Sequence, residues 1–287
     1  MERLTFFFDG VDNAPAEEPP GEAPINTVFE STVADTLRQY LQPKDGLSLT
    51  NAALAIISLL PETPRPAGLS EEYPILWELC VNAAEQIPYH HVCQMKLARL
   101  VIALRHSPKI TATYIWDQSR DIKFTSELYR LAETVRDIYN PAYSVHGSDE
   151  KWNVEDGKRW VNTMAFYAHL HALNGGMLST LCTWTMGDAF LSTASTKYDA
   201  LDCHISAAAQ WILCTGQNIF SSILAPEEED EESLLGNRNL WTMDDWRRWK
   251  TGFAAAEREE NLQQETRQLA KRSANLMEVL EATMVSV

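Results

Sequence analysis

Apolar residues recur at helical spacing along most of this chain, and no Asp, Glu, Lys or Arg stands between Asp202 and Glu227. Three consecutive alanines from Ala207 favour a helix, and apolar side chains follow on several sides of it. A helix that is apolar most of the way round is normally buried among other helices. We therefore expect a buried central helix over about residues 198–224, whose amides, such as that of Gln210, face an interior cavity or neighbouring backbone.

The same periodicity predicts helices along the rest of the chain, with breaks at proline and glycine. Thr242 followed by Asp245 predicts a capping box at the start of one of them. No stretch shows the alternation of apolar and polar residues that is typical of a strand. The fold class is therefore all-α, with about ten helices in a single domain over residues 26–287. Three of the other expected helices begin near residues 26, 242 and 259. The remaining six run over about residues 49–60, 70–83, 88–104, 122–138, 155–173 and 177–195.

The first 25 residues differ from the rest in composition. Residues 9–25 combine Asp and Glu with four prolines and few apolar side chains. Such a segment buries too little apolar surface to offset the loss of conformational entropy on folding. We expect residues 1–25 to form a flexible acidic arm.

Charge and cysteine usage narrow the class of protein. The net charge of −16 argues against a nucleic-acid partner, because binding phosphates requires a basic surface. The uncharged runs contain too many amides and hydroxyls to cross a lipid bilayer, and the first residues lack the apolar core of a signal peptide. Five cysteines without a CxxC pair indicate reduced thiols packed as small apolar groups. These features predict a cytoplasmic protein with no membrane span.

Asp188 is the only charged residue between Arg159 and Lys197. A lone carboxylate in a buried helix costs several kcal/mol unless it is paired or bound to a metal. One interpretation is structural: a bond to a backbone amide, a distant arginine, or an exposed turn beside Gly187. The other is that Asp188 is a metal ligand or a general base.

Lys250 is the second unusual residue. In WTMDDWRRWKTGF it shares a helical face with Trp246, Trp249 and Phe253. The lysine either extends along the indole rings to solvent, or its ammonium lies in an aromatic-walled pocket suited to an anion such as diphosphate.

Motifs for common catalytic sites are missing, and those of isoprenoid chemistry are incomplete. The sequence has no GxGxxG, Walker, GxSxG or HExxH motif. The aspartate-rich DDxxD segment of ordinary class I terpene cyclases is also missing. Their second metal motif, Asn-x3-Ser-x3-Glu, is matched only by Asn218 and Ser222, because Pro226 stands where the glutamate belongs.

Four motifs together resemble a known family. IPYHHVCQMKL, WVNTMAFYAHL, AAAQWIL-x2-G and W-x2-WK-x2-F, in this order, resemble a fungal family of helical proteins mostly catalogued as a domain of unknown function. The resemblance covers about residues 70–284. The same C-terminal pattern is similar to that of the atypical humulene synthases of tropolone sesquiterpenoid pathways. Those enzymes lack DDxxD and cyclise farnesyl diphosphate with two Mg²⁺ ions and an essential lysine.

The resemblance implies a Mg²⁺-dependent sesquiterpene synthase of fungal secondary metabolism, acting on an isoprenoid diphosphate. Lys250 would be its catalytic lysine, Trp246 would face the prenyl chain, and Asp188 would be the metal ligand on the argument from burial alone. The competing hypothesis is a non-enzymatic helical protein that binds a protein partner or an apolar ligand. For each aromatic ring taken singly, plain core packing is the more common role. The residues expected to bind substrate are Trp246, Trp249, Trp211, Trp184, Phe166 and Asn218.

Overall fold

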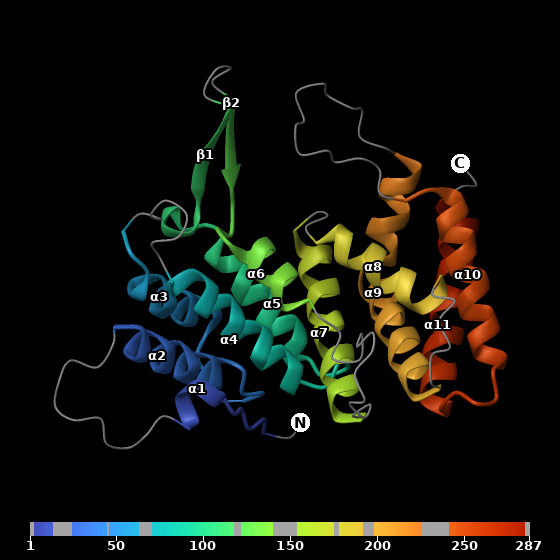
Figure 1. Ribbon diagram of the computed structural model, residues 1–287, viewed down its shortest axis with the longest axis horizontal. Helices are drawn as coiled ribbons and strands as arrows, with labels where there is room; N and C mark the ends of the chain where they lie inside the picture. The colour runs from blue at the N-terminus through green and yellow to red at the C-terminus, as the bar shows by residue number, and fades with distance from the viewer. Residues whose placement is uncertain are drawn as a thin grey trace, which may run out of the picture. The chain divides into compact units, whose positions relative to one another are not determined.

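The computed structural model confirms the all-α fold class, with eleven α-helices and one small hairpin among the residues it describes (Figure 1). Contacts divide the chain into two compact units, Met1–Tyr139 (the N-terminal unit) and Asn140–Val287 (the C-terminal unit). The single domain over residues 26–287 stays a prediction. The structure describes residues 3–13, 25–44, 46–62, 71–117, 122–139, 154–174, 178–191, 198–225 and 241–284.

The N-terminal unit is built mainly from helices that bury aromatic and aliphatic side chains. Trp77 on α4 is fully buried, and its indole N–H donates to the carbonyl of Tyr129 at 2.8 Å. Helix α2 contacts α3 and α4, and α4 contacts α5 and α6. The elements are α1 (Asp9–Asp12), α2 (Ile25–Tyr40), α3 (Leu49–Leu59), α4 (Glu72–Gln86), α5 (Cys93–Leu104), a 3-10 helix (Pro108–Ile110), β1 (Ala112–Asp117), β2 (Ile122–Ser126) and α6 (Leu131–Ile138).

The helix predicted over residues 122–138 is wrong in its first half. Strands β1 and β2 form an antiparallel hairpin in which Ala112 pairs with Ser126 and Tyr114 with Phe124. Both strands are rich in β-branched and aromatic residues, which favour extended backbone. Leu128 and Arg130 then adopt positive φ angles of 56° and 67°, so a continuous helix cannot pass through them. Only α6 remains of the predicted helix.

Part of the segment expected to be a flexible arm is packed against helices. Residues 3–13 run along the N-terminal unit, with Phe6 and Phe8 buried and the short helix α1 at their end. The prediction rested on the acidic composition of residues 9–25. Two buried phenylalanines just before them supply the apolar surface that holds the segment in place. Residues 14–24 of the expected arm lie outside the described residues.

The C-terminal unit surrounds one long helix. Helix α9 contacts α7, α8, α10 and α11, and its fully buried side chains include Trp211 and Phe220 (Figure 1). The predicted central helix is therefore confirmed, with the bounds Tyr198–Leu224. The other elements are α7 (Val154–Leu173), α8 (Ser179–Phe190), α10 (Met243–Arg258) and α11 (Gln264–Met284).

Polar side chains of α9 bond to nearby backbone. Buried Asp202 accepts from the N–H of Gln263 at 2.9 Å, next to the start of α11. Buried Gln210 donates to the carbonyl of Ser206 at 3.2 Å. Of the two predicted environments, an interior cavity or neighbouring backbone, these contacts match the second.

Helix starts were predicted with mixed success. The capping box at Thr242 is present: its hydroxyl accepts from the Asp245 N–H at 3.2 Å, and the Asp245 carboxylate accepts from the Thr242 N–H at 3.0 Å. The helix expected to open at Pro88 begins at Cys93 instead, because residues 88–92 form turns.

Within the described residues, no helix has the length and apolar character needed to cross a membrane.

Candidate functional site

Lys250 on α10 forms an ion pair with Glu281 on α11. Its Nζ atom donates to Oε2 of the glutamate, and the two side chains are 30% and 24% exposed. The second carboxylate oxygen of Glu281 is buried without a hydrogen-bond partner in the described part of the chain. The ammonium of Lys250 is thus paired with a carboxylate of the protein itself. It neither extends freely into solvent nor lies unpaired in a pocket.

The aromatic residues around Lys250 are core residues of the C-terminal unit. Trp246 is fully buried and lies 4.7 Å from the ring of Phe220 on α9, measured between centroids. Trp249 is also buried and meets Trp241 edge to face at 6.3 Å. Phe253 packs against Phe190 of α8 at 4.8 Å. The stripe predicted from helical spacing exists, and it faces packed side chains.

Gly252 lets α8 and α10 approach each other within this core. A Cβ atom built on Gly252 would overlap the ring of Phe190, with two ring carbons at 2.8 and 2.9 Å. Any other residue there would force the Phe190 ring, or the two helices, to shift. The glycine in the W-x2-WK-x2-F motif therefore serves helix packing.

The remaining predicted substrate residues do not share one environment. Trp211 and Phe166 are fully buried, in α9 and α7. Trp184 on α8 is 40% exposed. Asn218 is exposed, and its amide donates to the carbonyl of Ala172 at 3.2 Å. The structure thus places two of these four residues in the core and two at the surface.

Asp188 lies on the exposed face of α8. The residues that share this face at helical spacing are Trp184, Gly187, Asp188 and Leu191, and Leu191 is exposed. Nothing within 4 Å would meet a Cβ atom on Gly187, so the surface there is open. Partial burial raises the pKa of the Asp188 carboxyl above its ordinary value. Asp188 has no hydrogen bond or ion pair with any residue that the structure describes.

Asp188 and Lys250 do not converge on one site. Phe190 turns toward Gly252 and Phe253 of α10, and Asp188 precedes it by two residues, about 200° round the helix. Lys250 is directed to α11 instead. No group of three His, Cys, Asp or Glu side chains within the described ranges is arranged to hold a metal ion. The surroundings of Asp188 therefore do not fit a Mg²⁺ site built from these residues, and Mg²⁺ stays a prediction.

A buried histidine joins three helices, which the sequence did not indicate. Nδ1 of His171 on α7 lies 2.9 Å from the hydroxyl of Thr215 on α9, and Nε2 lies 3.3 Å from the hydroxyl of Ser179 on α8. Burial lowers the pKa of His171 to about 4. The arrangement has the order of a nucleophile, a base and an orienting group, but so weak a base is poorly suited to remove a proton from serine.

Comparison with known families gives a match over much of the chain. Residues 77–253, from within α4 to within α10, match the family described as "Protein of unknown function (DUF3632)". This span is more than half of the chain. The protein belongs to the DUF3632 family. The match includes Asp188 and Lys250 but ends before Glu281, and it begins after the N-terminal segment and α2.

The family assignment confirms the predicted resemblance to a helical family of unknown function. The finer resemblance to humulene synthases stays a prediction. Curated proteins gave no match to this DUF3632 chain, and neither did solved structures.

Proposed function

We propose that this DUF3632 protein is a non-enzymatic helical protein that binds a basic, amphipathic helix of a protein partner on the exposed face of α8. The observation that supports this function best is the position of Asp188. A half-buried carboxylate without a counter-charge among the described residues lies between an exposed indole and an exposed leucine. Such a surface pairs apolar contacts with one fixed negative charge.

The chemistry of the partner follows from this face. Trp184 and Leu191 offer apolar area one turn to either side, and the open surface at Gly187 leaves room for an inserted side chain. A lysine or arginine of the partner would satisfy the Asp188 carboxylate, and hydrogen bonds to charged groups are the stronger ones. The net charge of −16 would also attract a basic partner.

Binding can be tested with a labelled helical peptide that carries leucines on one face and lysines on the other. The wild-type protein is expected to bind it, and Asp188→Asn to bind it at least about tenfold more weakly, because a charge-assisted hydrogen bond contributes about 1.5–3 kcal/mol. Trp184→Ser is expected to weaken binding by a similar factor through lost apolar area. Fluorescence anisotropy at fixed salt measures the dissociation constants.

Glu260→Gln is the matched control, because it removes one exposed negative charge from the turn between α10 and α11 instead of from α8. A version of the peptide with glutamate in place of lysine controls for apolar binding alone. If Glu260→Gln weakens binding as much as Asp188→Asn does, the peptide responds only to net charge and the α8 face is not its site.

A sesquiterpene synthase remains the second candidate function. The observation that favours it is Lys250, 30% exposed, in the motif W-x2-WK-x2-F, which the resemblance to humulene synthases assigns to catalysis. In this proposal, an isoprenoid diphosphate displaces Glu281 and takes its place on the ammonium. The lysine would then stabilise the negative charge that grows on the departing diphosphate.

Incubation with farnesyl diphosphate and Mg²⁺, followed by gas chromatography of the headspace, tests this candidate. If it is correct, Lys250→Ala should lower hydrocarbon formation by about 10²–10³, the usual loss for such a contact. Glu281→Gln should retain activity or raise it, since it releases the lysine for diphosphate. No hydrocarbon from either the wild type or Glu281→Gln would exclude the synthase.

A further inference from the structure

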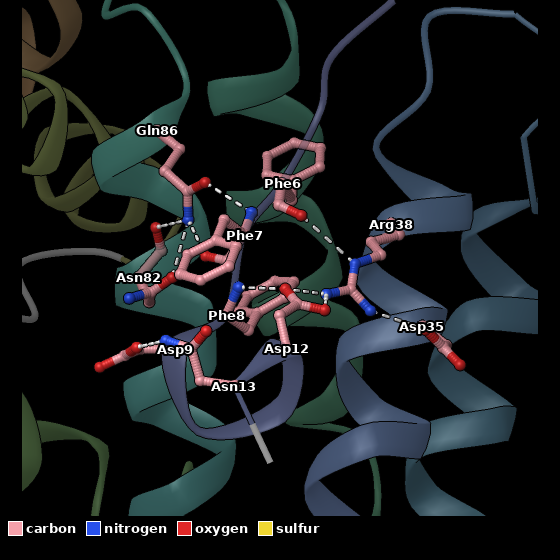
Figure 2. A network of polar contacts seen from close by, with 10 residues as sticks. All are labelled: Phe6, Phe7, Phe8, Asp9, Asp12, Asn13, Asp35, Arg38, Asn82 and Gln86. Atoms are coloured by element: carbon pink, nitrogen blue, oxygen red, sulfur yellow. Dashed lines mark hydrogen bonds and ion pairs between the residues drawn. The ribbon is translucent and has the colours of Figure 1, made fainter. Parts of the chain in front are cut away.

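The N-terminal segment is held on the N-terminal unit through its main chain. Figure 2 shows Gln86, the last residue of α4, clasping the backbone of Phe7. The Gln86 carboxamide accepts from the Phe7 N–H and donates to the Phe7 carbonyl, both at 2.8 Å. The same Gln86 amide nitrogen donates to the Asn82 side chain at 2.7 Å, which orients the clasp. A two-point contact of this kind recognises extended backbone whatever the side chain.

Alternate side chains of the segment supply the anchors. Phe6 and Phe8 are 6% and 1% exposed, and their rings stack at 6.5 Å between centroids. Phe7 between them is 52% exposed, so its side chain contributes little to the contact. The guanidinium of Arg38, on α2, lies 5.0 Å above the Phe8 ring. We call the surface formed by α2 and α4 around Arg38 and Gln86 the seam. It binds aromatic residues that are two positions apart.

A carboxylate completes the recognition. Asp12 accepts from Arg38 at 2.6 and 2.7 Å, through both of its oxygens, and also from the Phe8 N–H at 2.8 Å (Figure 2). Arg38 is held in turn by Asp35 at 2.8 Å. Main-chain hydrogen bonds and pockets for alternate side chains are one way in which proteins recognise short peptides, and an arginine–carboxylate pair adds affinity and geometric specificity.

An open cavity lies beside the segment at the end of α2. Its volume is about 710 Å³, and it lies between Leu4 and Phe6 of the segment and Gln39, Gln42 and Leu47 at the end of α2 and beyond. The Gln42 amide donates to the carbonyl of Leu4 at 3.1 Å, a further contact to segment backbone.

From these contacts we propose that the seam between α2 and α4 is a peptide-binding site that the chain's own residues 3–13 occupy in cis. Its other ligands are peptides of protein partners with two aromatic residues separated by one position, and an acidic residue four positions after the second, as in Phe6, Phe8 and Asp12. Residues 14–24 tether the segment to α2, and a short tether gives its ligand an effective concentration in the millimolar range. A partner peptide therefore binds only when the segment is released.

The test uses the full chain with a site-specific protease sequence inserted between residues 14 and 24. Labelled peptide of residues 1–13 is added before and after cleavage, and fluorescence anisotropy measures binding. We expect at least a hundredfold tighter binding after cleavage, because the tether no longer favours the segment. An unlabelled peptide of unrelated sequence that keeps only the two phenylalanines and the aspartate should compete.

The neighbouring phenylalanines provide a matched pair of control peptides. Phe8→Ala in the peptide should weaken binding more than tenfold, whereas Phe7→Ala should leave it within about twofold, since Phe7 is mostly exposed. Gln86→Ala in the protein should weaken the binding of both.

Three results would overturn the proposal. The first is that cleavage lowers the helical circular dichroism of the protein. The second is that the cut segment does not exchange with labelled peptide. Either result would mean that residues 3–13 are a permanent part of the fold. The third is that the unrelated peptide does not compete. The seam would then bind only the chain's own segment, and the proposed partner peptides would be excluded.

Discussion

Replacing Trp246 by alanine is expected to lower the free energy of unfolding by about 3–5 kcal/mol. The indole is fully buried against Phe220, so its removal loses transfer free energy and leaves a cavity. A residue that merely lines a substrate pocket would respond differently, because the space beside it is already open. Denaturant unfolding followed by far-UV circular dichroism measures the change.

Trp184→Ala is the matched control for this experiment. The same side chain is removed from the surface of α8, where it is 40% exposed, and we expect a change much smaller than at Trp246. If Trp246→Ala instead loses less than about 1 kcal/mol, the tryptophan borders open space, and a prenyl pocket next to Lys250 gains support.

Acid is expected to destabilise the C-terminal unit through His171. Burial lowers the pKa of this histidine to about 4, from an ordinary value of 6.5. Because the folded state binds the proton less readily than the unfolded state, stability is full above pH 6.5 and falls as the pH drops toward 4. The loss from this one group reaches about 3 kcal/mol. His204, whose pKa burial also lowers to about 4, acts in the same direction.

The contribution of His171 can be isolated by comparing slopes. Plots of unfolding free energy against pH between 6.5 and 4 should be shallower for His171→Gln than for the wild type, although this variant loses stability at neutral pH. His106→Gln, a change at an exposed position, should leave the slope unaltered. Equal slopes for all three proteins would mean that His171 accepts a proton in the folded state.

Much of the helical framework could be predicted from the sequence, because its causes are local. The uncharged run after Asp202 predicted α9, and Thr242 with Asp245 predicted a helix start. Strand β2 was missed because apolar residues at helical spacing run from Phe124 in the strand through Leu128 to Leu131 and Val135 of α6. The helix cannot extend through Leu128 and Arg130 because their backbone is left-handed. Neither residue is a glycine or asparagine, so the sequence does not mark this conformation.

The candidate site was less predictable, since its contacts are distant in the sequence. Helical spacing put Lys250 next to the aromatic stripe, yet its partner Glu281 is 31 positions away on another helix. Gln86 and Phe7 are 79 positions apart, and nothing local to either marks them as partners. The lone charge of Asp188 did signal an unusual position, but its surroundings depend on which face of α8 is covered.

The clasp at Gln86 also constrains how the chain is made. Phe7 leaves the ribosome before Gln86, which follows it 79 residues later. At roughly 5–20 residues per second, the three phenylalanines wait about 4–16 s for the helix that receives them. During that interval they form an exposed aromatic run on the nascent chain, and transiently exposed apolar surface of this kind is a reason that chaperones exist. The segment that completes the N-terminal unit therefore leaves apolar surface exposed during synthesis until α4 has formed.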